Sequence, residues 1–172
     1  IKTPLPSEED PLIWNDTKPY KERLKDAKKK TEQDCAIMVA KGIINNIEVT
    51  VAASNFSFLG GSISLAESEA LIYAIKHSID NKTPFINFCS GGGMRMMASA
   101  VSLTKGMAAT TIAINELKKN KLPYIVCVVD PCAGGISASY AMTGDIIMGE
   151  VGALCAFAGR RVVQATVKEE LP

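Results

Sequence analysis

Two glycine-rich turns hold the residues of this sequence that are best suited to chemistry. Gly134 and Gly135 stand in DPCAGGISASYAMTGD (residues 130–145), where they follow the apolar run YIVCVVD. A triple glycine, residues 91–93, follows a second apolar run, PFINFC. Glycine permits positive φ and lets a ligand approach the backbone closely, and N–H groups at a strand-to-helix turn can face an anion. Both turns are therefore candidates for binding negative charge.

Three functional interpretations and one structural interpretation compete for these turns. Phosphate binding lacks its usual sequence support, because neither GxxxxGKS/T nor GxGxxG is present. A nucleophile elbow would use GISAS (Gly135–Ser139), but the final glycine of GxSxG is missing, and the single histidine, His77, is expected on a helix surface. An oxyanion hole needs only backbone N–H groups. Structurally, the glycines could serve only to let helix and strand pack closely.

The composition favours one reduced, cytoplasmic domain without an electrostatic reason for a nucleic-acid or membrane partner. The 172 residues suffice for a sizeable core, and 19 basic against 18 acidic residues give a net charge of +1. No apolar run approaches the roughly 18–20 residues of a spanning helix, and no signal peptide opens the chain. The five cysteines include no CxxC pair, so we expect no zinc site within these residues. Because the chain begins at Ile1 and stops after LP, we expect a piece of a longer protein.

Strands alternating with helices predict an α/β fold with parallel strands and right-handed crossovers. In such sheets ligands bind beyond the carboxyl ends of the strands, where both glycine turns lie. An extended arm (1–17) and a basic helix (18–33) precede a hairpin whose strands start at Cys35 and Ile47. The further predicted strands are 84–89, 124–130, 145–149 and 153–157, and the further predicted helices are about 64–81, about 94–120, 136–144 and 162–170.

Five segments, in order, resemble the carboxyltransferase β subunit of bacterial and plastid acetyl-CoA carboxylase. They cover nearly the whole chain, and five collinear matches are far more specific than one. The segments are DPLIWNDTKPYKERLKDAKKKT, NFSFLGGSIS, PFINFCSGGGMRMM, LPYIVCVVDPCAGGISASYAMTGD and FAGRRVVQATVKEELP.

The resemblance implies a crotonase-like ββα superhelix and a biotin-dependent activity. The family transfers the carboxyl group of carboxybiotin, held on a biotin carboxyl carrier protein, to acetyl-CoA, which gives malonyl-CoA for fatty acid biosynthesis. It acts only with a related α subunit, as a heterotetramer, in the cytoplasm or plastid stroma. We accordingly expect an arm and basic helix at 1–34 and the carboxyltransferase domain at 35–172. The family's N-terminal zinc ribbon and C-terminal tail are expected outside these residues.

The resemblance also assigns site residues. The N–H groups of Gly134, Gly135 and Ile136 are expected to form an oxyanion hole, which we assign to the ureido oxygen of biotin. The substrate-binding positions are expected to be Gly91, Gly92, Gly93, Arg95 and Ser137. The first four are expected to form the loop that lines the CoA side. Arg95 has a second interpretation, as a buried arginine that fixes the loop through backbone carbonyls.

The chain departs from the family pattern at Asn55, Ser64, Met94, Met97–Ala98, Arg160 and Gln164. A catalytically impaired paralogue that serves as a scaffold for the α subunit is therefore one alternative. Another crotonase-fold enzyme acting on an acyl-CoA is a second, and it would need a carboxylate such as Asp130 or Glu150 beside the oxyanion donors.

Two side-chain clusters have competing interpretations. Lys28, Lys29 and Lys30 could face the CoA phosphates, but we interpret them as a solvated helix face. The methionines Met94, Met96 and Met97 are interpreted as core residues rather than as a cofactor site.

Overall fold

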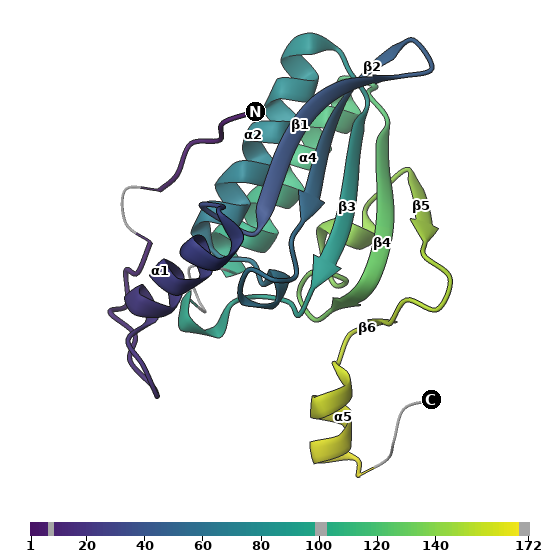
Figure 1. Ribbon diagram of the computed structural model, residues 1–172. Helices are drawn as coiled ribbons and strands as arrows, with labels where there is room; N and C mark the ends of the chain where they lie inside the picture. The colour runs from purple at the N-terminus through teal and green to yellow at the C-terminus, as the bar shows by residue number, and fades with distance from the viewer. Residues whose placement is uncertain (7–8, 99–102, 169–172) are drawn as a thin grey trace.

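A twisted sheet forms the centre of the molecule (Figure 1). The computed structural model describes residues 1–6, 9–98 and 103–168. The strand order is β1-β2-β3-β4-β5, with β6 pairing β4; β1 is antiparallel to β2 and the other pairs are parallel. The strands are β1 (Ile37–Ile44), β2 (Ile47–Ser54), β3 (Phe85–Gly91), β4 (Tyr124–Ala133), β5 (Ile146–Gly149) and β6 (Cys155–Ala156).

The β1–β2 hairpin is confirmed as the sequence predicts it. Asn45 and Asn46 form the turn, with φ of 48° and 64°, and Ile44 pairs with Ile47. Asparagine tolerates positive φ better than most residues, and a two-residue turn of this kind matches the right-handed twist of the strands.

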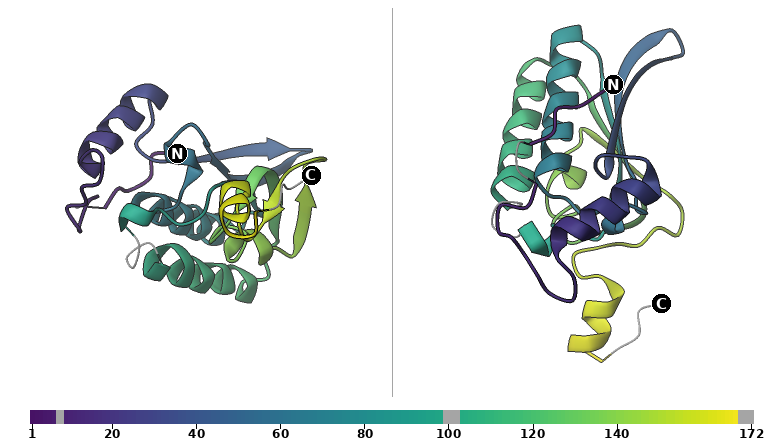
Figure 2. Two further views of the ribbon diagram at one scale, coloured as in Figure 1. Left: turned by 90° about the horizontal axis from the view of Figure 1, so that it is seen from below. Right: turned by 60° about the vertical axis from the view of Figure 1, so that its left-hand side comes forward.

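Two helices cover one face of the sheet (Figures 1 and 2). They are α2 (Leu65–Asn81) and α4 (Thr110–Lys119). Leu71 and Ile75 of α2 pack into the main core, where the stacked rings of Phe85 and Tyr124 lie 5.3 Å apart between centroids. Because β2, β3, β4 and β5 run parallel, the loops at their carboxyl ends lie at one end of the sheet.

Two predicted helices are wrong in extent. Residues 94–120 were expected to form one helix, but a 3-10 turn (η2, Met96–Ala98) and a π-helix (η3, Leu103–Ala109) precede α4. The cause is a pairing with a distant segment: Ile63 N donates to Gly93 O at 2.9 Å, and Arg95 N donates to Ile63 O at 2.8 Å. A backbone paired in this way cannot adopt helical φ and ψ.

The second error concerns residues 136–144, which form turns and a single 3-10 turn, η4 (Tyr140–Met142). Ser139 has φ −136° and ψ −116°, and its hydroxyl donates to the carbonyl of Gly135. Serine hydroxyls compete with helix formation in this way by offering the backbone another partner.

The C-terminal elements are shorter than predicted. The strand expected at 153–157 is limited to β6, and the helix expected at 162–170 is α5 (Arg160–Thr166). Residues 169 and 170 lie outside the described part of the chain. Figure 1 places α5 beyond the sheet, at the end where the loops of β3 and β4 meet.

The basic helix α1 (Tyr20–Thr31) packs against the domain through one narrow stripe. Its buried residues Tyr20, Leu24 and Ala27 form a small cluster with Ala36 and Phe58. The i, i+4, i+7 spacing puts these three side chains on one face. The domain boundary expected at residue 34 stays a prediction.

A buried thiol makes the stability of the fold pH-dependent. Burial and the nearby Glu67 carboxylate raise the pKa of Cys35 from about 9 to about 12. The neutral thiol is therefore favoured in the folded protein, so its stabilising contribution is present below about pH 9 and is lost as pH rises toward 12.

We expect the wild type to lose about 2 kcal/mol more unfolding free energy than Cys35→Ala between pH 8 and pH 10.5. Urea titrations at both pH values measure this, and equal losses in the two proteins would contradict it.

Candidate active site

Three glycine turns meet backbone to backbone at the carboxyl ends of β2, β3 and β4, the lower end of the sheet in Figure 1. An added Cβ on Gly61 would lie 2.8 Å from Ser90 O, and one on Gly91 would overlap Gly61 O. At the next interface, a Cβ on Gly134 would lie 3.2 Å from Gly92 O. Gly61, Gly91 and Gly134 also have positive φ. These glycines therefore allow a contact between turns that side chains would prevent, whereas the structural interpretation expected close packing of helix and strand.

The 134–137 turn also presents backbone donors. Among the described residues, the N–H groups of Gly135, Ile136 and Ser137 donate no hydrogen bond. Buried or half-buried N–H groups are almost always paired. Three successive N–H groups without an acceptor therefore indicate a place for an external one.

Gly134 requires a correction to the predicted site. Its N–H donates to Phe157 O at 2.9 Å and to Ala156 O at 3.2 Å, so it is already occupied. These acceptors lie in and after β6, which the sequence pattern did not bring next to Gly134. Gly134 turns the chain, with φ of 64°, and its N–H serves the protein rather than a ligand.

The serines of this turn hold its shape. The Ser137 hydroxyl lies 2.8 Å from Ala156 O and 3.0 Å from Gly134 O, and Ser139 bonds the carbonyls of Gly135 and Ile136. The predicted substrate-binding residue Ser137 thus offers its N–H, because its hydroxyl is used within the protein. Substrate contact by Ser137 stays a prediction.

The 91–93 turn is fixed from both sides. Gly92 N donates to Gly60 O at 3.0 Å, and Gly93 O accepts from Ile63 N. Gly91 and Gly93 are buried, whereas Gly92 is exposed. A Cβ on Gly93 would lie 3.1 Å from Gly135 N, so the two predicted glycine turns are direct neighbours.

Arg95 lies inside the protein, with a side chain that is 2% exposed. Its guanidinium donates to Ser62 Oγ and Ser62 O, to Tyr20 Oη at 2.9 Å, and to Glu67 Oε1 at 2.7 Å. It also lies over the ring of Phe58, 5.6 Å from the centroid. Of the two interpretations of Arg95, the geometry favours the arginine that fixes the loop. Substrate contact by Arg95 stays a prediction.

The charged groups around Arg95 favour each other's protonation states. Burial lowers the pKa of Arg95, but the Glu67 carboxylate and Tyr20 raise it by more, so the guanidinium stays charged. Burial raises the pKa of Tyr20, which keeps its phenol neutral. Glu67 is the residue that the sequence analysis missed. The pattern Ser64-x-x-Glu67 is that of a capping box and could have identified it.

The two carboxylates considered as bases serve the backbone instead. Asp130 Oδ1 accepts from Leu154 N at 2.8 Å, and Glu150 Oε2 accepts from Asp130 N at 3.1 Å. Both therefore hold the connection between β5 and β6.

His77 does not pair with the serines of the GISAS segment. Its Nδ1 lies 3.0 Å from Thr50 Oγ1, and Thr50 is paired with Phe85 at the start of β3. That is the opposite end of the parallel strands from Gly135. A serine–histidine nucleophile is thus not formed, and half-buried His77 lines a separate hollow of about 260 Å³.

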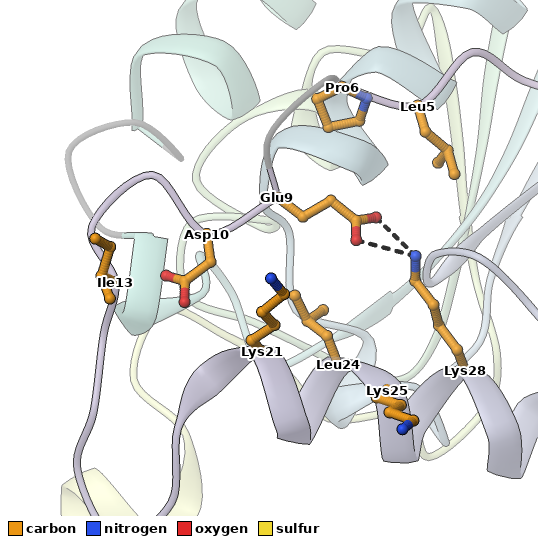
Figure 3. A pocket seen from close by; sticks show the side chains of 9 residues that line it. All are labelled: Leu5, Pro6, Glu9, Asp10, Ile13, Lys21, Leu24, Lys25 and Lys28. Carbon is orange, nitrogen blue, oxygen red and sulfur yellow. Dashed lines mark hydrogen bonds and ion pairs between the residues drawn. The ribbon is translucent and has the colours of Figure 1, made fainter.

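A larger hollow, about 1100 Å³, lies between the N-terminal arm and α1 (Figure 3). Lys28 Nζ bonds both carboxylate oxygens of Glu9 across it, at 2.9 and 3.0 Å. Lys21, Lys25 and Asp10 also line it, so its charge is mixed. Because Lys28 is already paired and Lys29 and Lys30 are exposed, these lysines fit a solvated helix face better than a phosphate site.

The described residues contain no cluster of three or more His, Cys, Asp or Glu side chains that could hold a metal ion. All five cysteines are free thiols. Within the same part of the chain, none of the helices has the length and apolar character needed to cross a membrane.

Comparison with known proteins places the chain. The sequence pattern of the carboxyl transferase domain matches residues 10–171. The chain belongs to the carboxyl transferase domain family. The acetyl-coenzyme A carboxylase carboxyl transferase subunit beta of Pelagibacter ubique is 61% identical to this carboxyl transferase domain over 172 residues, which are 100% of this chain and 55% of that protein. The chain spans about half the length of the curated relatives it matches.

Solved structures confirm the crotonase-like α/β fold of this carboxyl transferase domain. The transcarboxylase 12S structure with methylmalonyl-coenzyme A and methylmalonic acid bound has a TM-score of 0.64 and 24% identity, covering 79% of this chain and 26% of that one. The Pseudomonas malonate decarboxylase hetero-tetramer in complex with malonate has a TM-score of 0.66 and 22% identity, covering 76% and 49%.

The interlocked turns predict a sharp difference between two glycine-to-alanine variants. Gly61→Ala should lower the unfolding free energy by roughly 2–4 kcal/mol, because φ is 63° there and the Cβ meets Ser90 O. Gly42→Ala, in exposed β1 with nothing within 4 Å of its Cβ, should change it by less than about 0.5 kcal/mol. Urea denaturation of both variants measures this. Equal stabilities would show that the turns do not depend on close backbone contact.

Proposed function

We propose that this chain is part of the carboxyltransferase β subunit of an acetyl-CoA carboxylase, which transfers a carboxyl group from biotin to acetyl-CoA to form malonyl-CoA. The family membership and the 61% identity to a relative of that name support the proposal. The observation that carries it is the row of N–H groups at residues 135–137 without an acceptor among the described residues.

These donors suit an oxygen on which negative charge develops. Fixed N–H groups stabilise such an oxygen without reorganising during the reaction, and losing one donor typically costs about 3–4 kcal/mol of transition-state stabilisation. Gly135, Ile136 and Ser137 would hold the ureido oxygen of biotin. Biotin, carried on a partner protein, supplies the carboxyl group when bound.

The neighbouring 91–93 turn would line the acyl-CoA side. Gly92 is exposed, and a Cβ on Gly93 would lie only 3.1 Å from Gly135 N. A thioester placed on this turn would therefore lie beside the donors of the 135–137 turn. Short separation between the two substrates favours direct transfer, because fixed proximity replaces an encounter in solution.

The remaining partners of the proposed enzyme are a carboxyltransferase α subunit and a biotin carboxyl carrier protein. Exposed apolar side chains on the edge strand β5 and in the segment after it support a contact surface there, and they include Ile146, Ile147, Met148, Val151 and Phe157. The family's zinc ribbon stays a prediction for residues outside this chain.

A scaffold without catalysis is the second candidate function, and one observation favours it. Met94 stands where the family pattern has alanine, and a Cβ on Gly135 would lie 2.7 Å from Met94 Cγ. The methionine thus covers part of the surface over Gly135. A methionine side chain is flexible enough to move aside for a ligand, so we prefer the enzyme.

The assay is biotin-dependent conversion of malonyl-CoA to acetyl-CoA by the complete β subunit assembled with its α partner. Gly135→Val should lower kcat about 100-fold or more, because the side chain meets Met94 and closes the approach to the donors. Gly42→Val, on exposed β1, is the matched control and should keep the wild-type rate.

Two outcomes would contradict the proposal in different ways. A wild-type rate in Gly135→Val would remove the oxyanion role from this turn. An assembled wild-type complex without any turnover would support the scaffold.

A further inference from the structure

Glu67 is a completely buried carboxylate with every oxygen in use. Its Oε1 accepts from Arg95 Nη2 at 2.7 Å and from Ala36 N at 3.0 Å, and its Oε2 accepts from Ser64 N at 2.9 Å. The ion pair with Arg95 is shielded from water on both sides, with side-chain exposures of 0% and 2%.

This ion pair joins segments that are far apart in the sequence. Through Glu67 and Arg95 it connects the start of α2 with the 91–95 loop, and through Ala36 it reaches the segment before β1. Arg95 adds the backbone and hydroxyl of Ser62 and the phenol of Tyr20 on α1. The glycine turn at 91–93 is thus fixed at a node where five segments meet.

The connection to the glycine turn is short and runs through the backbone. Arg95 N donates to Ile63 O at 2.8 Å, and Ile63 N donates to Gly93 O at 2.9 Å. On the other flank Gly92 N donates to Gly60 O. The Arg95 side chain bonds Ser62, which adjoins Ile63, so the side chain and the glycine turn are linked through the same short stretch of backbone.

A carboxylate is required here by hydrogen-bond chemistry. Ala36 N, Ser64 N and Arg95 all donate, so both oxygens of residue 67 must accept. A glutamine of the same shape has one acceptor and one NH₂ donor, which would face either Ser64 N or the guanidinium. It would also leave the Arg95 charge buried without its counterion.

Fold stability alone does not account for such a pair. Burying two charges costs desolvation, and well-packed apolar residues often replace a buried ion pair without loss of stability. What a charge-assisted hydrogen bond adds, together with the two backbone N–H groups that also donate to the carboxylate, is a fixed geometry. Among the segments it fixes, the 91–93 turn is the one that we assign to the acyl-CoA.

We propose that Glu67 is a positioning residue, which acts through Arg95 to hold the 91–93 turn in the geometry that binds the acyl-CoA. This inference rests on the proposed function, since it concerns the turn that we assign to the acyl-CoA substrate of that reaction. It predicts that the effect is specific for the CoA ester and leaves biotin binding unchanged.

The test compares Glu67→Gln with Glu69→Gln in the complete β subunit assembled with its α partner. Glu69 lies on the same helix but is partly exposed and bonds Lys105 at 3.3 Å. Glu69→Gln is therefore the same substitution placed outside the hydrogen bonds that surround Arg95. In Glu67→Gln we expect KM for malonyl-CoA to rise roughly tenfold and KM for biotin to stay within about twofold. Glu69→Gln should match the wild type in both.

A milder variant keeps the test usable if Glu67→Gln fails to assemble. Tyr20→Phe removes one hydrogen bond to Arg95 and keeps both charges, and it should raise KM for malonyl-CoA about two- to fivefold.

Three results would overturn the inference. A lower kcat with both KM values unchanged would mean fewer folded molecules and only a structural role. Equal increases in both KM values would remove the specificity for the CoA ester. Unchanged kinetics in Glu67→Gln would remove the role altogether.

Calorimetric binding of acetyl-CoA separates this inference from the proposed function. If the wild-type complex binds acetyl-CoA but does not turn over, the proposed function fails, and weaker binding by Glu67→Gln alone still supports the positioning role. A wild-type complex that neither binds acetyl-CoA nor turns over would overturn both.

Discussion

The arrangement of this end of the molecule depends on the contact between backbones at three glycine turns. Gly61 lies against Ser90 and Gly91, and Gly134 lies against Gly92 and Gly93. An added Cβ would lie 2.8 Å from Ser90 O at Gly61 and 3.2 Å from Gly92 O at Gly134, so these contacts leave little or no room for one. They bring two strand ends together without an intervening side chain. The N–H donors at 135–137 lie close to the 91–93 turn only because no side chain separates the two turns. The site that we propose therefore consists of main-chain atoms, with side chains in supporting roles.

Main-chain contacts need support from outside the turns, because glycine gains nothing from side-chain packing and has the most conformational freedom to lose. Three kinds of support surround the turns. The hydroxyls of Ser137 and Ser139 hold the 134–137 turn locally. The bonds of Gly134 N to Ala156 O and Phe157 O connect that turn to β6. The buried ion pair of Arg95 and Glu67 holds the 91–93 turn from the side of α2.

The sequence predicts those parts that depend on local pattern. The Asn45–Asn46 turn, the buried face of α2 and the apolar strands all follow from residue type and spacing, and both glycine turns are visible in the same way. The parts that it misses depend on pairing across distance. Residues 94–109 are rich in residues that favour helices, yet Ile63, about 30 positions earlier, holds Gly93–Arg95 extended. The occupied N–H of Gly134 likewise depends on acceptors some 20 residues later.

Met94 departs from the family pattern beside the proposed site. A site made of backbone atoms can tolerate such a changed side chain, but the new side chain limits which residues fit at position 135. A methionine there packs against Gly135, where an added Cβ would lie 2.7 Å from Met94 Cγ. The larger side chain therefore makes glycine at 135 more necessary, not less, since φ at this residue would otherwise admit alanine. At the same time Met94 leaves the N–H groups of residues 135–137 where the bonds of Gly134 and Ser137 place them. A substitution beside such a site therefore changes access to the N–H donors before it changes their positions. The flexible thioether of Met94 can restore that access by moving aside.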